Sequence, residues 1–536
     1  MTAAATSGAP ASADVPPVRI DPRTRLEILG AILLGLFLSA LDQTVVGTAL
    51  PRIVDDLRGN DLYTWVFTVY LLTSTVTGPI YGKLSDLFGR RPIIMTGIVL
   101  FLLGSALSGL SREMWQLILF RGIQGLGAGA LFPVALAVIG DLFTPAERGK
   151  YQGLFGAVFG VSALIGPALG GIITDSIGWP WVFFVNLPVG AVALIIIWRT
   201  LPSVRRPDAA RSIDYLGAAV FSAAIIPILV GLTNKQTADW TDPAVGGLIL
   251  TGLVIAALFV WVESRAAEPL VPLSLFANRT FSISVTASFL SAFGFFGAVV
   301  FLPRWFQVVR GASATESGYE TLPLLAGLIG SSILSGQIVS RTGRYKTVML
   351  VSMSLVAIGL FAMSHLETDT PLPILWSWML ITGLGIGPSF AILTLIVQNA
   401  VPFRALGAAT SGLVLFRQVG GTVGLAIVGT LFGTALREEI PGQLAAHGVP
   451  QQFIDRFGAT GFRTDEVVTV GDLGQTILAG VPEQFRGLVE PLIPDIVAAI
   501  HDAFSVATAH SFLVGIVAAV AAAGLCLWLP EVPLRT

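Results

Sequence analysis

Residues 82–92 read Gly82-Lys83-Leu84-Ser85-Asp86-Leu87-Phe88-Gly89-Arg90-Arg91-Pro92. A weaker copy follows about 254 residues later, as Gly336-Gln337-Ile338-Val339-Ser340-Arg341-Thr342-Gly343-Arg344-Tyr345-Lys346. The same offset relates Gly166-Pro167-Ala168-Leu169-Gly170 to Gly420-Gly421-Thr422-Val423-Gly424. Chance enrichment of glycine and arginine in loops is the alternative explanation. Two matches at one offset favour a duplicated chain with two similar halves.

The composition outside the repeat indicates a membrane protein. Of the 536 residues, 54% are hydrophobic and only 12% are charged, whereas soluble domains carry about 25% charged residues. The 31 basic and 33 acidic residues give a net charge of −2, so the chain has no basic field for binding nucleic acid. We therefore expect an integral membrane protein without a nucleic-acid partner.

The sequence lacks the residues that several classes of enzyme require. Cys526 is the only cysteine, and the four histidines are too scattered to suggest a metal site. Neither a phosphate-binding GxxxxGK[ST] motif nor a GxSxG nucleophile motif occurs. We expect no enzyme, no metal and no cofactor, and an energy source other than ATP.

Apolar runs of about 20 residues, the length that crosses a bilayer, predict fourteen membrane spans. They lie near 27–50, 62–82, 92–110, 113–141, 149–173, 181–199, 214–233, 244–263, 280–303, 318–340, 346–365, 373–397, 405–434 and 506–530. With the repeat, they predict an all-α protein of two six-helix bundles and an inserted helix pair. The predicted divisions are a disordered tail 1–26, an N-terminal bundle 27–199, a linker with helices 7 and 8 at 200–263, helices 9–13 at 264–434, an extracellular flap 435–505, helix 14 at 506–530, and a tail 531–536.

The distribution of lysine and arginine predicts the orientation of these spans. With the N-terminus in the cytoplasm, nineteen basic residues fall in cytoplasmic segments and six in short external loops. Basic residues accumulate on the cytoplasmic side of short loops. We therefore expect both termini, and the 82–92 loop, in the cytoplasm.

Four motifs give the chain a resemblance to a known family. They are Leu41-Asp42-Gln43-Thr44-Val45-Val46-Gly47-Thr48-Ala49-Leu50-Pro51, the loop Gly82 to Arg91, Arg121-Gly122-Ile123-Gln124-Gly125, and the segment Gly160 to Gly171. Together they resemble the major facilitator superfamily over nearly the whole chain, in particular its fourteen-helix drug:proton antiporter branch of the EmrB/QacA type. The resemblance implies the major facilitator fold and multidrug efflux.

Asp42 is the only carboxylate well inside a predicted span, and an ion there needs a partner or a proton. Asp42 and Arg121 lie at similar depths, about 12 Å from the outer ends of their helices. Burial favours the protonated form of a carboxyl group and a nearby arginine favours the ionised form, so a change in their separation would move a proton. A purely structural polar pair is the alternative. In similar antiporters these two positions are assigned proton-transfer roles.

The loop and the fifth span carry the remaining motif residues. The loop residues suggest a conformational latch, and these residues are Gly82, Asp86, Gly89, Arg90 and Arg91. The resemblance implies that the latch stabilises the outward-open state. Arg90 and Arg91 would also enforce the membrane topology, and that role is compatible with a latch. The second copy has Ser340 in place of the acid. The small residues and proline of the fifth span predict close packing and a kink, and resemble the antiporter motif of exporters, although ordinary packing would also explain them. These residues are Gly160, Gly166, Pro167, Gly170 and Gly171.

A further set of residues is expected to line a substrate cavity: Gln43, Gln124, Phe293, Phe296, Glu320 and Arg417. Arg417 lies within a span and should face the cavity or bond backbone carbonyls. Glu320 could pair with Arg304 at the external mouth. The phenylalanines could stack on lipophilic substrates, although aromatic residues in membrane helices more often pack.

These features predict a proton-coupled exporter of lipophilic or cationic drugs that works by alternating access in a bacterial-type plasma membrane. Its expected partners are the substrate, protons and membrane lipids, and we expect a monomer driven by the proton gradient. An exporter of a native lipid or amphiphilic metabolite is the main alternative. A non-transporting sensor or scaffold lacks any flanking signalling domain.

Overall fold

The structure is a computed structural model that describes residues 21–58, 62, 65–202, 214–235, 238–266, 269–402, 405–451, 454, 473–480, 486–487, 489–531 and 533. All regular structure within these residues is helical. The predicted tail before residue 21, the linker around 203–213 and the flap residues 455–472 lie outside the described residues.

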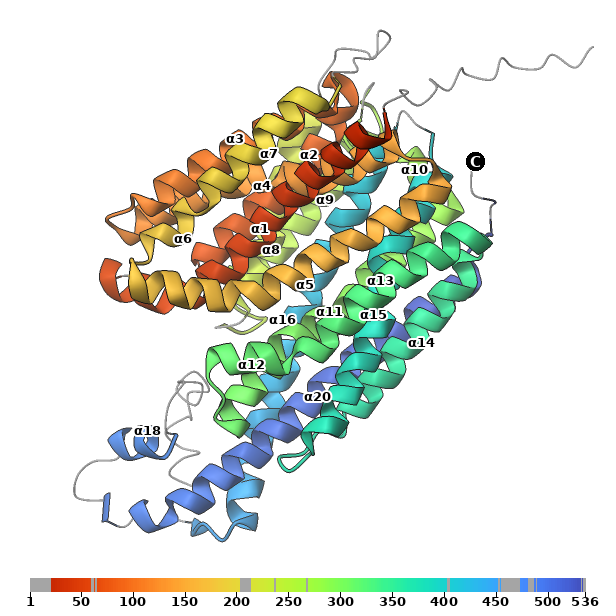
Figure 1. Ribbon diagram of the computed structural model, residues 1–536. Helices are drawn as coiled ribbons and strands as arrows, with labels where there is room; N and C mark the ends of the chain where they lie inside the picture. The colour runs from red at the N-terminus through yellow and green to blue at the C-terminus, as the bar shows by residue number, and fades with distance from the viewer. Residues whose placement is uncertain are drawn as a thin grey trace, which may run out of the picture.

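Helices α1 to α7 form the N-terminal group in Figure 1, coloured red to yellow. They are α1 (Pro22–Leu57), α2 (Trp65–Phe88), α3 (Arg90–Gly109), α4 (Met114–Leu142), α5 (Pro145–Ser176), α6 (Pro180–Phe184) and α7 (Asn186–Thr200). Asp21 caps α1 by accepting a hydrogen bond from the backbone N of Arg23 at 3.1 Å. The chain is therefore already helical at the last residues of the predicted tail.

The second group follows two inserted helices, α8 (Tyr215–Asn234) and α9 (Leu248–Glu263). The C-terminal helices, green to blue in Figure 1, are α10 (Ser274–Ala277), α11 (Arg279–Arg310), α12 (Ala314–Glu320), α13 (Leu322–Thr342), α14 (Tyr345–Met363), α15 (Leu372–Ala400), α16 (Leu406–Ala446), α18 (Leu473–Gly480) and α20 (Ile493–Leu527). We call the end of the molecule where α1 begins and α20 ends the tail face.

Thirteen helical segments within the described residues are long and apolar enough to cross a membrane. Helix α2 is not among them, because its threonine, serine and glycine residues and Pro79 lower its mean hydropathy. With its 24 residues packed among the spanning helices, α2 supplies the fourteenth predicted span. The inserted helix α9 exposes large apolar side chains, among them Leu250 and Trp261, as a lipid-facing helix does.

Two helices extend beyond the predicted spans. Helix α16 continues to Ala446 instead of ending at 434, and α20 begins at Ile493 instead of 506. Leu436, Ile440 and Leu444 lie on one buried face of the extension and share a core cluster with residues at the start of α20. Because the opposite face of the extension is polar, the sequence showed no continuous apolar run here, and the extension was not predicted as a helix.

The repeat in the sequence is a repeat in the structure. Gly89 and Gly343 hold equivalent places after α2 and α13, with φ of 92° and 69°. Only glycine adopts such angles without strain. Helix α5 packs on α1 through Gly170, and α16 packs on α11 through Gly424, so the second motif pair also occupies equivalent contacts.

Candidate functional site

Asp42 and Arg121 form an ion pair in the interior of the N-terminal half. Arg121 Nη1 donates to Asp42 Oδ2 at 2.5 Å, and both side chains are fully buried. Asp42 comes from α1 and Arg121 from α4, as their matching depths predicted. Removing two charges from water costs several kcal/mol per ion, so the pair depends on further hydrogen bonds.

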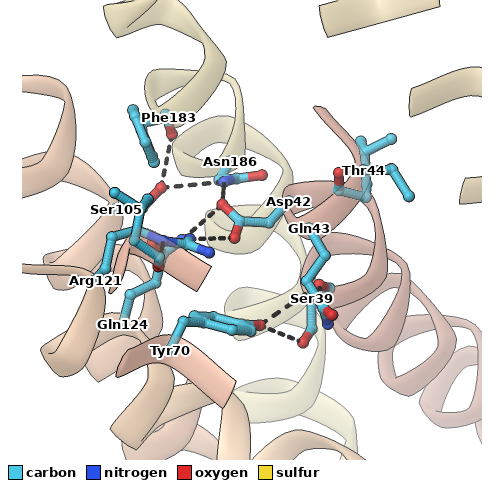
Figure 2. A network of polar contacts seen from close by, with 12 residues as sticks. Ser39, Asp42, Gln43, Thr44, Tyr70, Ser105, Arg121, Gln124, Phe183 and Asn186 are labelled. Carbon is cyan, nitrogen blue, oxygen red and sulfur yellow. Dashed lines mark hydrogen bonds and ion pairs between the residues drawn. The ribbon is translucent and has the colours of Figure 1, made fainter. Parts of the chain in front are cut away.

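Polar side chains of α2, α4 and α7 surround the pair (Figure 2). Asp42 Oδ1 accepts from Gln124 Nε2 at 2.8 Å and from Asn186 Nδ2 at 3.0 Å. Arg121 also donates to Gln124 Oε1 at 2.7 Å and lies over the Tyr70 ring, 4.3 Å from its centre. Because every partner of Asp42 is a donor, the arrangement fits its ionised form.

The environment of the pair corrects one prediction. Gln124 was expected to line a substrate cavity, but it is fully buried, with both ends of its amide bound to the ion pair. Asn186 and Tyr70 were missed, and Asn186 is in turn held by Ser105 Oγ at 3.1 Å. Asn186 could have been recognised as an isolated amide within an otherwise apolar run.

Helix α5 packs directly beside Asp42. A Cβ atom on Gly166 would collide with Thr44, two residues after Asp42, and one on Gly170 would lie 2.8 Å from Val45 O. A Cβ atom on Gly160 would likewise collide with Ile329 of α13, in the other half. Gly171, by contrast, has nothing within 4 Å of a Cβ position. The motif therefore joins the Asp42 helix to the opposite half, and Gly171 takes no part in the close packing.

The 82–92 segment joins the two halves at the tail face. It was predicted as a loop, but α2 continues to Phe88 and α3 begins at Arg90, so only Gly89 lies between the helices. Asp86 accepts hydrogen bonds from the backbone N of Gly407 and Ala408, at 3.2 and 3.0 Å. These amides belong to the first turn of α16, whose own cap position, Ala405, has no side-chain acceptor. Asp86 thus serves as an N-cap supplied by the other half.

Arg90 fixes this cap in place. Its Nη1 lies 2.6 Å from Asp86 Oδ1, and its Nε donates to Asp141 Oδ2 at 2.9 Å. Gly82 provides the room, because a Cβ atom there would collide with Ser411 of α16. Arg91 instead donates to the carbonyl of Trp198 within the N-terminal half. In the second copy, the hydroxyl of Ser340 donates to Gln337 O of its own helix.

Arg417 is the buried arginine of the C-terminal half. It donates to Ser288 Oγ and to the carbonyl of Ser389, both at 3.1 Å, and lies 4.4 Å from the centre of the Phe390 ring. No carboxylate among the described residues pairs with it. Arg417 was predicted either to face the cavity or to bond backbone carbonyls, and in this structure it bonds a backbone carbonyl.

The other predicted cavity residues are dispersed. Gln43 donates to Ser39 O of its own helix at 3.4 Å. Phe293 and Phe296 pack against Gly424 and Gly421 of α16. This is the packing role that was the alternative to stacking on a substrate. Glu320, at the end of α12, accepts from Trp376 Nε1 at 2.8 Å. These residues do not form one site in this conformation.

Comparisons with known proteins agree with this architecture. The family model of the Major Facilitator Superfamily matches residues 32–425. The multidrug transporter protein MdtP of Bacillus subtilis (strain 168) is 41% identical over 408 residues, covering 76% of this chain and 75% of that protein. Multidrug resistance protein 3 of the same strain is 35% identical over 519 residues, covering 96% of each. The tetracenomycin C resistance and export protein of Streptomyces glaucescens is 33% identical over 423 residues, covering 78% of each.

Solved structures share the fold at low identity. The proton:xylose symporter XylE has a TM-score of 0.59 at 15% identity, covering 96% of this chain and 98% of that chain. The human organic anion transporter MFSD10 has a TM-score of 0.59 at 17% identity, covering 77% of this chain and 94% of that chain. The family model, the relatives and these structures together confirm the predicted all-helical major facilitator fold and the prediction that this is a membrane transporter rather than an enzyme. The chain is a multi-pass membrane protein that belongs to the major facilitator superfamily.

Proposed function

We propose that this chain exports lipophilic or cationic drugs across the bacterial inner membrane in exchange for protons, by alternating access. The observation that carries the proposal is the fully buried ion pair of Asp42 and Arg121. A structural role alone would be served as well by apolar residues. Relatives named as multidrug transporters and as a resistance and export protein support the substrate class.

The geometry suggests how proton and substrate exchange. Asp42 is held ionised while Arg121, Gln124 and Asn186 donate to it. If α1 moves relative to α4, the carboxylate loses donors in a dry environment, and a proton then stabilises it. Helix α5 links this movement to the other half, because Gly166 contacts Thr44 and Gly160 contacts Ile329.

The proton gradient would be sufficient for this work. A force of roughly 150 mV supplies about 3.5 kcal/mol per proton, which sustains a roughly 300-fold gradient of a neutral substrate. We propose that no cofactor takes part and that a monomer, surrounded by membrane lipids, is the working unit. The tail face is cytoplasmic in this proposal, so the bond from Asp86 to α16 closes the cytoplasmic side.

A native lipid or amphiphilic metabolite is the second candidate substrate. The observation that favours it is the length of α16, whose 41 residues span about 60 Å, twice the roughly 30 Å of a hydrocarbon core. Such an extension could shield a lipid outside the membrane. Shortening α16 and α20 together would stop lipid export and leave dye export intact if the extension serves that purpose.

Everted membrane vesicles test the main proposal. With an imposed pH gradient, we expect vesicles containing this protein to accumulate a fluorescent cation such as ethidium, and an uncoupler to abolish the accumulation. Vesicles without the protein are the control. Accumulation that continues in the uncoupler would contradict proton coupling, and no accumulation in any condition would favour the lipid or metabolite alternative.

A further inference from the structure

The inserted helices pack against both halves near the latch. Phe221 of α8 shares an apolar cluster with Leu415 of α16, and Ile80 of α2 packs against the same cluster. The connection after α9 contributes Val271. A change of charge within the inserted pair would therefore act close to the bond between Asp86 and α16.

Two carboxyl groups meet at this place. Asp214 caps α8, and its Oδ1 accepts from Gly217 N at 2.7 Å. Glu263 ends α9, is only 2% exposed, and its Oε1 accepts from Val271 N at 2.5 Å. Each carboxyl group thus has one oxygen bound to a backbone amide.

The second oxygen of each group is buried without a hydrogen-bond partner among the described residues. Both oxygens approach the same point, because a Cβ atom on Gly217 would collide with Asp214 Oδ2 and lie 2.9 Å from Glu263 Oε2. Two ionised carboxylates in this position would repel each other in a dry environment. An unsatisfied charged oxygen is also costly to bury.

We propose that Asp214 and Glu263 share one proton and form a proton-binding site separate from Asp42. A proton between Oδ2 and Oε2 makes one carboxyl group the donor and the other the acceptor, so a single occupant satisfies both oxygens. A divalent metal ion fits less well, since calcium and magnesium require about six oxygen ligands. The described residues contain no cluster of three metal-ligating side chains. The site goes beyond the proposed function and exists whether or not Asp42 carries the transported proton.

The charged groups around the site connect it to the latch. Lys83 of α2 and Asp214 act electrostatically on Glu263, while Arg265 lies over the Trp261 ring, 4.1 Å from its centre. From α16 the neighbours are apolar. Lys83 precedes Asp86 by three residues on α2, one helical turn away. Loss of the shared proton adds a negative charge beside this turn and so changes the electrostatics of the latch.

Infrared spectroscopy of the full-length protein in lipid tests the site. In an Asp42→Asn background at neutral pH, we expect the carbonyl stretch of one protonated carboxyl group per chain. It should disappear when either Glu263→Gln or Asp214→Asn is added, since each amide mimics the protonated pair and keeps the fold. Glu438→Gln, at an exposed position of α16, is the matched control and should leave the band unchanged.

Three results would overturn the proposal. One is the absence of any protonated carboxyl band in the Asp42→Asn protein, which needs no second variant. Another is a band that survives both added substitutions. The third is saturable binding of sodium or calcium that removes the band and depends on Glu263, because a metal ion would then be the occupant. Since Asp42 is absent throughout, failure of this site leaves the proposed coupling at Asp42 untouched.

Discussion

Each half holds an arginine in its interior, Arg121 in one and Arg417 in the other, but the two are neutralised differently. Arg121 in the N-terminal half meets a carboxylate, Asp42, at 2.5 Å. Among the described residues, Arg417 in the C-terminal half meets neutral groups, the hydroxyl of Ser288, the carbonyl of Ser389 and the ring of Phe390. The duplicated halves thus share their helices and packing, while among the described residues only Arg121, of these two arginines, pairs with a carboxylate.

This difference suggests a division of labour between the halves. The N-terminal half changes its charge when Asp42 gains a proton, and its environment must then rearrange around Arg121. Arg417 contacts no titratable side chain among the described residues, so the charge at this place stays constant. We infer that the C-terminal half responds to the N-terminal half through α5 and the latch.

The largest expected effect comes from removing each arginine in turn. Arg121→Met leaves the buried carboxylate of Asp42 uncompensated, which should lower the free energy of unfolding by about 3–5 kcal/mol. Arg417→Met leaves only neutral acceptors and should cost about 1–3 kcal/mol. Unfolding of the purified proteins in detergent measures both values.

A double variant sharpens this test. Arg121→Met combined with Asp42→Asn removes both charges, so most of the lost stability should return. Equal losses for the two single arginine variants, with no recovery in the double variant, would show that the halves do not differ in the proposed way.

Two glycines of α5 provide the next comparison. Gly166→Ala forces a methyl group against Thr44 beside Asp42 and should cost about 1–3 kcal/mol of stability and a large part of transport. Gly171→Ala meets open space on the same helix and should leave both unchanged. Dye transport and thermal unfolding measure the pair, and equal behaviour of the two variants would contradict a special role for the contact between α5 and α1.

The smallest effect is expected at the latch and its second copy. Asp86→Ala removes the cap of α16, worth about 0.5–2 kcal/mol, while the buried Arg90 keeps Asp141 as its carboxylate partner. The amides of Gly407 and Ala408 should then exchange hydrogen faster. Ser340→Ala loses a bond within its own helix and should not change exchange at α13 measurably. Unchanged exchange at α16 in Asp86→Ala would mean that the latch does not hold the halves together.

The sequence predicted the helices well because hydrophobic length and the repeat are local signals. It also predicted the meeting of Asp42 and Arg121, since equal depth on two helices of one bundle brings side chains together. The side chains that surround the pair were harder to predict from the sequence. Asn186 and Tyr70 act through three-dimensional proximity, and no spacing in the chain relates them to Asp42.

Helix ends and cavity residues were predicted least well. The extension of α16 has a polar face that conceals its buried stripe of Leu436, Ile440 and Leu444. Phe293 and Phe296 pack against glycines of another helix, a fit that depends on helix rotation rather than on composition. The cap that Asp86 provides for α16 joins residues more than 300 positions apart, so no local rule could reveal it.

The most direct test of the central claim measures protons rather than dye. Purified protein is reconstituted into liposomes that contain a pH indicator, and a cationic substrate is added to wild type and to Asp42→Asn. We predict that substrate drives proton movement in wild type and that Asp42→Asn, although folded and still able to bind substrate, moves none. Substrate-driven proton movement of equal size in Asp42→Asn would contradict the account and place the coupling carboxylate elsewhere.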